Sequence, residues 1–252
     1  MNVIFDKIYC ISYLERMDRR RFMEYQFNIL GILDKVEFIN AFDFSKILPE
    51  DVLKGVHENI QKFPIFGCAL SHYKCVKHAK LFGYKKILIL EDDMCFNKNL
   101  TLIHKYFNAL PHDWDYIKYM YRWLEKPLDP KQFENKIQYI NLKSGILGNA
   151  NVNAGAYALN EKAIDLYLEI TESNKLNTSD YIKYFFSDFK DSPLNSYVPC
   201  ALICVQNIYL DEKCYYTTDE NIPQYGIPLF YFNIDDFYKP DVFFESILNK
   251  DR

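Results

Sequence analysis

The chain has 252 residues, of which 49% are hydrophobic and 25% are charged, a composition typical of a folded domain rather than a disordered chain. Its 34 acidic residues outnumber its 30 lysines and arginines, which gives a formal net charge of −4 at pH 7. This length excludes a small disulfide-stapled module. Because basic residues do not outnumber acidic ones, a nucleic-acid partner is not expected.

The sequence shows no export signal and no membrane span. Asp6 and Lys7 interrupt the N-terminal apolar run before it reaches the length of a signal peptide. The longest apolar run, Tyr197–Val205, contains Pro199 and is about half of the ~20 residues that a spanning helix needs. Seven cysteines without a Cys-x-x-Cys pair are typical of reduced thiols. We therefore expect a cytoplasmic protein without a transmembrane segment.

The first part of the chain alternates strand and helix patterns. The predicted elements are, in order, a strand at Lys7–Ser12, a helix that continues to Leu33, a strand at Val36–Phe42, a helix at Gly67–Phe82 and a strand at Lys86–Leu90. Gly83 is expected to end the second helix as its C′ residue. The last of these strands is continuously apolar, which is typical of a parallel strand covered on both faces.

The same alternation continues further along the chain. A helix at Leu102–Leu110, a strand at Tyr116–Met120, a strand ending at Leu159 and a helix capped by Asn160 are predicted. Periodicity fades after Asn207, so 207–252 is expected to be irregular. The pattern predicts a single α/β domain, residues 1–252, with a mostly parallel sheet and helices on both faces.

The helix predicted at Gly67–Phe82 carries an apolar stripe and two cysteines. The residues expected to form its buried face are Ala69, Leu70, Tyr73, Val76 and Ala79. Cys68 and Cys75 are seven residues apart, on one face of this helix, and we expect both to be buried structural thiols rather than metal ligands.

Three adjacent carboxylates, Glu91-Asp92-Asp93, follow the buried strand at Lys86–Leu90. In open α/β sheets, ligands bind at the carboxyl ends of strands. Because side chains alternate along an extended chain, Glu91 and Asp93 are expected on one side and Asp92 on the other. A Mn²⁺ or Mg²⁺ ion would relieve the repulsion between these charges when the substrate is a diphosphate. The three acids are therefore candidate metal ligands, with a solvated turn as the alternative.

The segment Gly67-Cys68-Ala69-Leu70-Ser71-His72 lies at the predicted start of the helix that leads into the acidic strand. Helix N-termini favour anions, so Ser71 and His72 are candidates for binding a phosphate or a sugar hydroxyl. A structural histidine is the alternative. A Ser-His-Asp triad is disfavoured because Ser71 and His72 are neighbours on one helix and no Gly-x-Ser-x-Gly motif is present.

Together these motifs resemble glycosyltransferase family 25, the lipooligosaccharide and collagen galactosyltransferases, over about residues 4–220. The matching segments are Ile8–Ile11 with Arg16-Met17-Asp18-Arg19-Arg20, Gly67–His72, Leu88–Asp93, Asp113-Trp114-Asp115, Ala156-Tyr157-Ala158-Leu159, Asp180, and Val198-Pro199 leading to Gln206. The resemblance implies a Rossmann-like fold of the GT-A type and a metal bound through an Asp-x-Asp-like motif.

The resemblance also implies an inverting transfer of a hexose, foremost galactose from UDP-galactose and next glucose from UDP-glucose. The acceptor would be a glycan or a hydroxylysine-type hydroxyl on a protein. Arg16 and Arg19 are expected to neutralise the departing diphosphate, and Tyr157 and Gln206 are further candidate substrate-binding residues. Asp180, beside the potential helix caps Thr178 and Ser179, is the candidate general base, with an acidic residue that only stabilises the first turn of a helix as the alternative.

Asp113 and Asp115 are alternative bases, each with a structural role as its simpler interpretation.

Two other functions remain open on the sequence. Departures from the family pattern at Ser12-Tyr13-Leu14 and at Gly155 keep open a catalytically inactive sugar-binding or scaffold relative. A metal-dependent phosphohydrolase using the three acids is the third hypothesis, although it lacks the additional His and Asp residues of two-metal sites.

Overall fold

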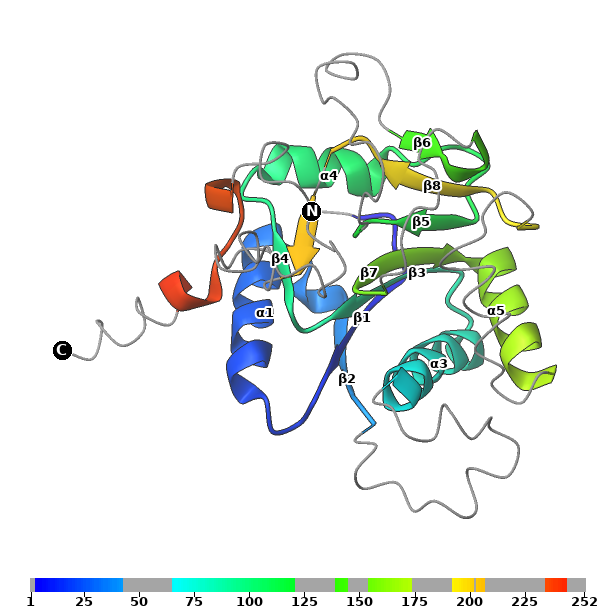
Figure 1. The fold of residues 1–252 in the computed structure, drawn as a ribbon, viewed down its shortest axis with the longest axis horizontal. Helices are drawn as coiled ribbons and strands as arrows, with labels where there is room; N and C mark the ends of the chain where they lie inside the picture. Colours follow the sequence, from blue (N-terminus) through cyan, green and yellow to red (C-terminus); the bar gives the residue numbers. More distant parts are fainter. Residues whose placement is uncertain are drawn as a thin grey trace, which may run out of the picture.

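The computed structural model describes residues 3–42, 65–120, 139–144, 154–173, 192–201, 203–206 and 234–243. Within these ranges the strands form a seven-stranded sheet in the order β2-β1-β3-β7-β5-β8-β6 and a second sheet of two strands, β4-β9. Helices lie on both faces of the large sheet (Figure 1). The predicted Rossmann-like α/β fold class is confirmed.

The elements of the structure have the following bounds. The helices are α1 (Met17–Leu30), α3 (Ile65–Phe82), α4 (Leu100–Asn108) and α5 (Glu161–Ser173), with short 3-10 helices η1 (Leu33–Lys35), η4 (Leu142–Ser144) and η9 (Ile234–Asp236). The strands are β1 (Lys7–Ser12), β2 (Val36–Asn40), β3 (Lys86–Glu91), β4 (Met94–Phe96), β5 (Tyr116–Lys118), β6 (Tyr139–Asn141), β7 (Ala156–Asn160), β8 (Ser196–Pro199) and β9 (Cys204–Gln206).

Glycines end two of the helices in the left-handed conformation. Gly83, with φ of 72°, follows α3 as predicted. Gly31, with φ of 65°, ends α1 three residues earlier than the predicted Leu33, which instead begins η1. Only glycine adopts this conformation without a steric cost, so it stops a helix even where apolar spacing continues.

The sheet separates two hydrophobic layers. On β3, Ile87 and Ile89 pack into the layer covered by α3 and α5, while Leu88 and Leu90 pack into the layer covered by α1 and α4. Figure 1 shows α1 and the pair α3 and α5 on opposite sides of the central strands. Every side chain from Ile87 to Leu90 is therefore buried, which explains the continuous apolar run of this strand.

The sheet is mixed rather than mostly parallel. The pairs β1-β2, β1-β3 and β5-β8 are parallel, whereas β3-β7, β5-β7 and β6-β8 are antiparallel. Strand β7 enters the centre of the sheet antiparallel to both of its neighbours. An apolar run indicates that both faces of a strand are covered, but it does not indicate the direction of the strand. The sequence pattern therefore did not predict that β7 is antiparallel to its neighbours.

The buried face of α3 differs from the predicted stripe. Val76 and Ala79 are buried as expected, but the other buried side chains of this face are Ser71, His72 and Cys75, while Tyr73 is only partly buried. The expectation for Cys75 is confirmed, and that for Cys68, which is exposed, is wrong. The buried polar side chains of this face all have hydrogen-bond partners: His72 contacts Tyr157 and Glu91 on the sheet, Ser71 contacts Gly67 and Phe42, and Cys75 contacts the Ser71 carbonyl.

Asp115, the residue before β5, connects the end of β7, the start of α5 and the segment that leads into β8. Its buried carboxylate accepts hydrogen bonds from Lys162 Nζ at 2.7 Å, the Asn195 backbone N–H at 2.8 Å and Asn160 Nδ2 at 3.1 Å. Burial disfavours the charge of Asp115, but the hydrogen bonds from Lys162, Asn195 and Asn160 lower its pKa below the ordinary value. The structural interpretation of Asp115 therefore accounts for both carboxylate oxygens.

We expect Asp115→Ala to destabilise the protein by about 2–4 kcal/mol, because it removes a buried carboxylate that accepts three hydrogen bonds and leaves the partly buried donors of Asn160 and Asn195 without this acceptor. The pKa of Asp115 is lowered by folding, so its contribution is present above its ordinary pKa of 3.8 and is lost as the pH falls. Urea unfolding at pH 7 and at acid pH measures both effects.

Asp113→Ala is the matched control, because the Asp113 side chain is 41% exposed and accepts from the Tyr197 hydroxyl at 2.8 Å. It should cost about 1 kcal/mol or less. Equal losses in the two variants would contradict the structural role of Asp115.

Among the described residues, no helix has the length and apolar character required to cross a membrane.

Candidate functional site

The three acids at the end of β3 contact different parts of the fold. Asp92 turns to β1 and α1, where its Oδ2 accepts from Ser12 Oγ at 2.6 Å and its Oδ1 from Arg19 Nη1 at 2.9 Å. Glu91 turns to α3 and Asp93 to β9. Asp92 thus has protein partners for both oxygens and anchors the acidic loop to the start of α1, while its role as a metal ligand stays a prediction.

Asp93 has an unsatisfied oxygen. Its Oδ2 accepts from Gln206 Nε2 at 3.3 Å, whereas its buried Oδ1 has no hydrogen-bond partner among the described residues. Burial and the nearby Glu91 carboxylate raise the pKa of Asp93 from 3.8 to about 7. A buried carboxylate oxygen without a donor is the kind of group that a hard divalent cation satisfies.

Gln206 reaches Asp93 through the small sheet. Strand β9 pairs antiparallel with β4, and Met94 lies opposite Gln206 in this register. The pairing places a side chain 113 residues away in sequence beside the acidic loop. The candidate Gln206 is thus brought to the same place as Glu91-Asp92-Asp93.

His72 connects Glu91 to the centre of the sheet. The imidazole is 1% exposed, with Nε2 3.2 Å from Glu91 Oε1 and Nδ1 2.8 Å from the Tyr157 hydroxyl on β7. The rings of His72 and Tyr157 are stacked with centroids 5.6 Å apart. A carboxylate only accepts, so Nε2 donates to Glu91, and in the neutral ring Nδ1 accepts from Tyr157.

The charge of Glu91 is stabilised by this contact. Burial opposes its ionisation, but hydrogen bonds from His72 and Cys68 and the nearby Arg19 guanidinium lower its pKa below the ordinary value. Glu91 is therefore ionised at neutral pH, whereas the neighbouring Asp93, with a pKa of about 7, titrates near neutral pH. The pKa values of the two candidate ligands shift in opposite directions because Glu91 accepts hydrogen bonds from His72 and Cys68, whereas Asp93 is buried beside the Glu91 carboxylate.

Ser71 and His72 lie further along α3 than expected. The helix begins at Ile65, so both residues are in its second turn and not at its N-terminus. Ser71 Oγ donates to the Gly67 carbonyl at 2.7 Å and accepts from the Phe42 N–H at 2.9 Å. These contacts give Ser71 a role in the fold, and the helix-terminus argument for a phosphate at this position does not apply.

The two arginines behave differently. Arg19 makes an ion pair with Asp92 and contributes positive charge near Glu91 and Asp93. Arg16, immediately before α1, is exposed and pairs with Asp18 at 2.7 Å. The structure brings Arg19 to the acidic loop, and it gives Arg16 a local partner instead.

Cys68 is a residue of this site that the sequence reasoning missed. Its exposed Sγ lies 3.5 Å from Glu91 Oε1, one helical turn before His72. The i, i+4 spacing of Cys68 and His72 was the available signal, because residues at that spacing share a helix face.

Asp180, the predicted base, lies outside the described residues. Of its alternatives, Asp115 is engaged in the network described above, and Asp113 accepts from Tyr197 and Asn195. Both therefore have structural partners.

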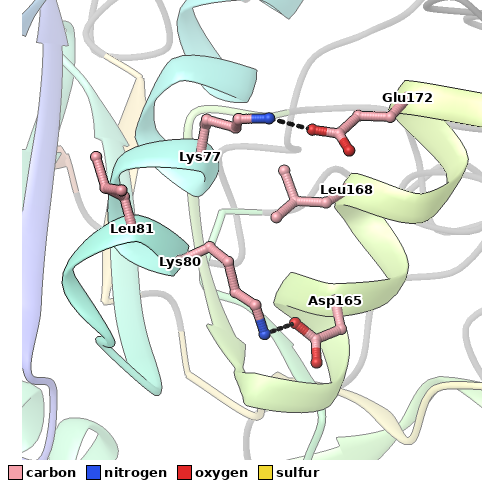
Figure 2. A pocket seen from close by; sticks show the side chains of 6 residues that line it. All are labelled: Lys77, Lys80, Leu81, Asp165, Leu168 and Glu172. Atoms are coloured by element: carbon pink, nitrogen blue, oxygen red, sulfur yellow. Dashed lines mark hydrogen bonds and ion pairs between the residues drawn. The ribbon is translucent and has the colours of Figure 1, made fainter.

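A separate surface pocket of about 450 Å³ lies between α3 and α5 (Figure 2). It is lined by Lys77, Lys80, Leu81, Asp165, Leu168 and Glu172. Figure 2 shows the ion pairs Lys77–Glu172 and Lys80–Asp165 joining the two helices across it. Its charges neutralise each other, and none of the predicted site residues lines it.

An α/β sheet with a carboxylate loop at the end of the buried strand β3 is consistent with a sugar-transferring enzyme, and the family comparison identifies the class. The sequence model of glycosyltransferase family 25, described as an LPS biosynthesis protein family, matches residues 5–182. The chain belongs to glycosyltransferase family 25. The family and the layered sheet agree with the GT-A type of fold expected from the sequence.

Known proteins show more distant similarity. A protein of Acanthamoeba polyphaga mimivirus named "Putative glycosyltransferase R655" is 39% identical over 98 residues, which are 37% of this chain and 30% of that protein. The chain thus matches less than a third of that relative's length.

Two solved structures are also similar. The first is a glycosyltransferase involved in glycosylation of the major capsid of PBCV-1, with 12% identity, a TM-score of 0.43, and coverage of 79% of this chain and 91% of that one. The second is the galactosyltransferase LgtC with donor and acceptor sugar analogs, with 17% identity, a TM-score of 0.33, and coverage of 67% and 65%.

Proposed function

We propose that this protein is an inverting, metal-dependent hexosyltransferase that uses a nucleotide sugar. The donor is foremost UDP-galactose and next UDP-glucose, and the acceptor is a hydroxyl of a glycan or of a hydroxylysine-type side chain. Family membership supports the reaction class. The observation that carries the proposal is the buried Asp93 Oδ1, without a hydrogen-bond donor among the described residues, beside ionised Glu91 at the end of β3.

The residues at this loop fit a hard divalent cation. Glu91 and Asp93 supply carboxylate oxygens of the kind that Mn²⁺ and Mg²⁺ prefer, and Gln206 holds the second oxygen of Asp93. When bound, Mn²⁺ or Mg²⁺ would neutralise the charge that develops on the departing UDP. Arg19, oriented by Asp92, adds a fixed positive charge next to the same loop.

The acceptor hydroxyl requires a base. In the proposed reaction, Asp180 takes the hydroxyl proton while the acceptor oxygen forms a bond to the anomeric carbon. The bond from that carbon to the diphosphate oxygen breaks on the opposite face, and UDP leaves with the bonding electrons. This displacement inverts the anomeric carbon and needs only one protein base.

A panel of nucleotide sugars tests the proposal. Thermal shift with and without Mn²⁺ should identify one UDP-sugar, because a ligand at 100 times its Kd adds about 2.7 kcal/mol to the stability. Transfer to a glycan or hydroxylysine acceptor, with release of UDP and inverted product stereochemistry, is the expected result. Binding without turnover would favour the inactive sugar-binding relative, and phosphate release from phosphoesters would favour the phosphohydrolase.

We expect His72→Ala to weaken Mn²⁺-dependent UDP binding by about 10- to 100-fold, the usual effect of losing a residue that orients a metal ligand. The substitution leaves Glu91 buried without its hydrogen-bond donor. Calorimetric titration of UDP in the presence of Mn²⁺ measures the change.

His78→Ala is a closely matched control for this prediction. On the same helix, His78 Nδ1 lies 2.8 Å from the Tyr9 hydroxyl and Nε2 lies 3.5 Å from Glu37 Oε1, so it repeats the contacts of His72 away from the acidic loop. Its UDP affinity should stay at the parent value. The same affinity in both variants would reduce His72 to a structural histidine.

A further inference from the structure

Three different metal-ligating atoms meet between α3 and the end of β3. Cys68 and His72 come from successive turns of α3, and Glu91 is the last residue of β3. Cys68 Sγ lies 3.5 Å and His72 Nε2 lies 3.2 Å from Glu91 Oε1, and all three atoms lie within 4.8 Å of one another. The group combines sulfur, nitrogen and oxygen, unlike the carboxylate pair of Glu91 and Asp93.

We propose that Cys68, His72 and Glu91 form a second cation site, which binds Zn²⁺ through sulfur, nitrogen and oxygen. The spacing fits this ion. Zinc-to-ligand bonds of 2.0–2.3 Å in a tetrahedron place neighbouring ligand atoms about 3.3–3.8 Å apart. Both contacts to Glu91 are already near these values, and a small rotation of the exposed Cys68 side chain brings Sγ closer to His72.

The surroundings of His72 are those of a metal-ligating histidine. Such residues are oriented by a hydrogen bond from their second ring nitrogen, which also selects the tautomer. Here Nδ1 lies 2.8 Å from the Tyr157 hydroxyl, and the buried stacked rings fix the plane of the imidazole. A hydroxyl both donates and accepts, so Tyr157 accommodates the change of tautomer that frees Nε2 for the ion.

The ligand set selects the metal. A thiolate with an imidazole and one carboxylate is a typical zinc environment, and Mg²⁺ and Mn²⁺ prefer sites made of oxygen. Three protein ligands leave one position of the tetrahedron to a water molecule or another oxygen. Exposed Cys68 provides the route of entry, and binding displaces its thiol proton to the solvent.

The site shares Glu91 with the cation of the proposed transferase. Zinc bound on the α3 side would hold Glu91 away from the ion at Asp93, so that the two metals compete for one carboxylate. Zinc would then inhibit the transferase reaction. This last consequence rests on the proposed function, whereas the site itself rests only on the three ligand atoms.

Cobalt(II) is the probe for the site, because it adopts zinc geometries and is coloured. Added to the metal-free, reduced full-length chain, Co²⁺ should give strong visible bands typical of tetrahedral coordination and a near-ultraviolet band from thiolate-to-cobalt charge transfer. Zn²⁺ should displace both. Cys68→Ser should abolish the charge-transfer band and weaken Zn²⁺ binding by about tenfold or more. Cys68 is exposed, so this variant keeps the fold.

Two matched variants serve as controls. Cys200→Ser removes a partly exposed thiol elsewhere, and His78→Gln changes the similarly placed histidine of α3; both should retain the parent spectrum and Zn²⁺ affinity. Weak bands typical of octahedral cobalt, or a charge-transfer band that survives in Cys68→Ser, would overturn the proposal.

Inhibition of sugar transfer by Zn²⁺ is a second measurement, and its outcome is independent of the cobalt spectrum. With Mn²⁺ constant, Cys68→Ser should raise the Zn²⁺ concentration for half-inhibition by about tenfold or more relative to the parent. Unchanged inhibition would refute the competition. If the parent transfers no sugar, the proposed function fails, and the cobalt spectrum still decides whether the zinc site exists.

Discussion

Asp93→Asn should reduce hexose transfer by about 10³-fold or more and abolish the dependence of UDP binding on Mn²⁺. Metal stabilisation of a leaving diphosphate contributes several kcal/mol, and each 1.36 kcal/mol is a factor of ten in rate. Asparagine keeps the size of the side chain and the contact with Gln206, but it removes the charge that holds the cation. Turnover and UDP titration, each with and without Mn²⁺, measure the effect.

The same variant should not lose stability in metal-free solution. Folding raises the pKa of Asp93 from 3.8 to about 7 through burial and the nearby Glu91, so the folded state favours neutral Asp93. Its ionisation therefore lowers the parent's stability as the pH rises from about 4 to about 7, and this cost is complete above pH 7. Asn is neutral throughout, so its gain in stability over the parent should be larger at pH 8 than at pH 5.

Asp113→Asn provides the control for UDP binding and for stability, because Asp113 is exposed and accepts from the Tyr197 hydroxyl. It should retain the parent's metal dependence and its pH profile of stability. Full Mn²⁺-dependent activity of Asp93→Asn would remove Asp93 from the proposed metal site.

Asp180→Asn should lower kcat by about 10²- to 10⁴-fold, the usual contribution of a general base, with UDP affinity near the parent value. The amide keeps the shape of the side chain and suits the start of a helix, so the melting temperature should change little. Measuring kcat, UDP affinity and melting temperature on one preparation separates a loss of basicity from a loss of structure.

Near-parent turnover of Asp180→Asn would move the base elsewhere, and the structure ranks the alternatives. The Asp115 carboxylate is engaged by Lys162, Asn195 and Asn160, so its replacement should act on stability. Asp113 is more exposed and would be the next residue to test.

Much of the local structure was predictable from the sequence. Strand β1 has the predicted bounds Lys7–Ser12, and Asn160 caps α5 by accepting from the Ala163 N–H at 3.0 Å. Gly83 ends α3 as expected. These features depend on apolar spacing, caps and left-handed glycines, all of which involve residues within a few positions of each other.

The candidate site was predictable in part. The acidic loop after β3 was evident, because three carboxylates directly follow a buried strand. The partners that distinguish these acids were not evident: Arg19 for Asp92, His72 for Glu91 and Gln206 for Asp93. Each partner lies on a different element. The sequence pattern therefore predicted three similar acids, whereas the fold gives each acid a different partner.

The sequence by itself determined the α/β class, the acidic loop, and the positions of the four long helices and of strands β1, β2, β3, β5 and β7, since each depends on neighbouring residues. Only the tertiary structure decided the antiparallel direction of β7, the contact of His72 with Tyr157 85 residues away, and the approach of Cys68 to Glu91. These depend on which strands pair and which face of α3 meets the sheet. Strand pairing and the orientation of α3 depend on packing over the whole chain, so local periodicity does not predict them.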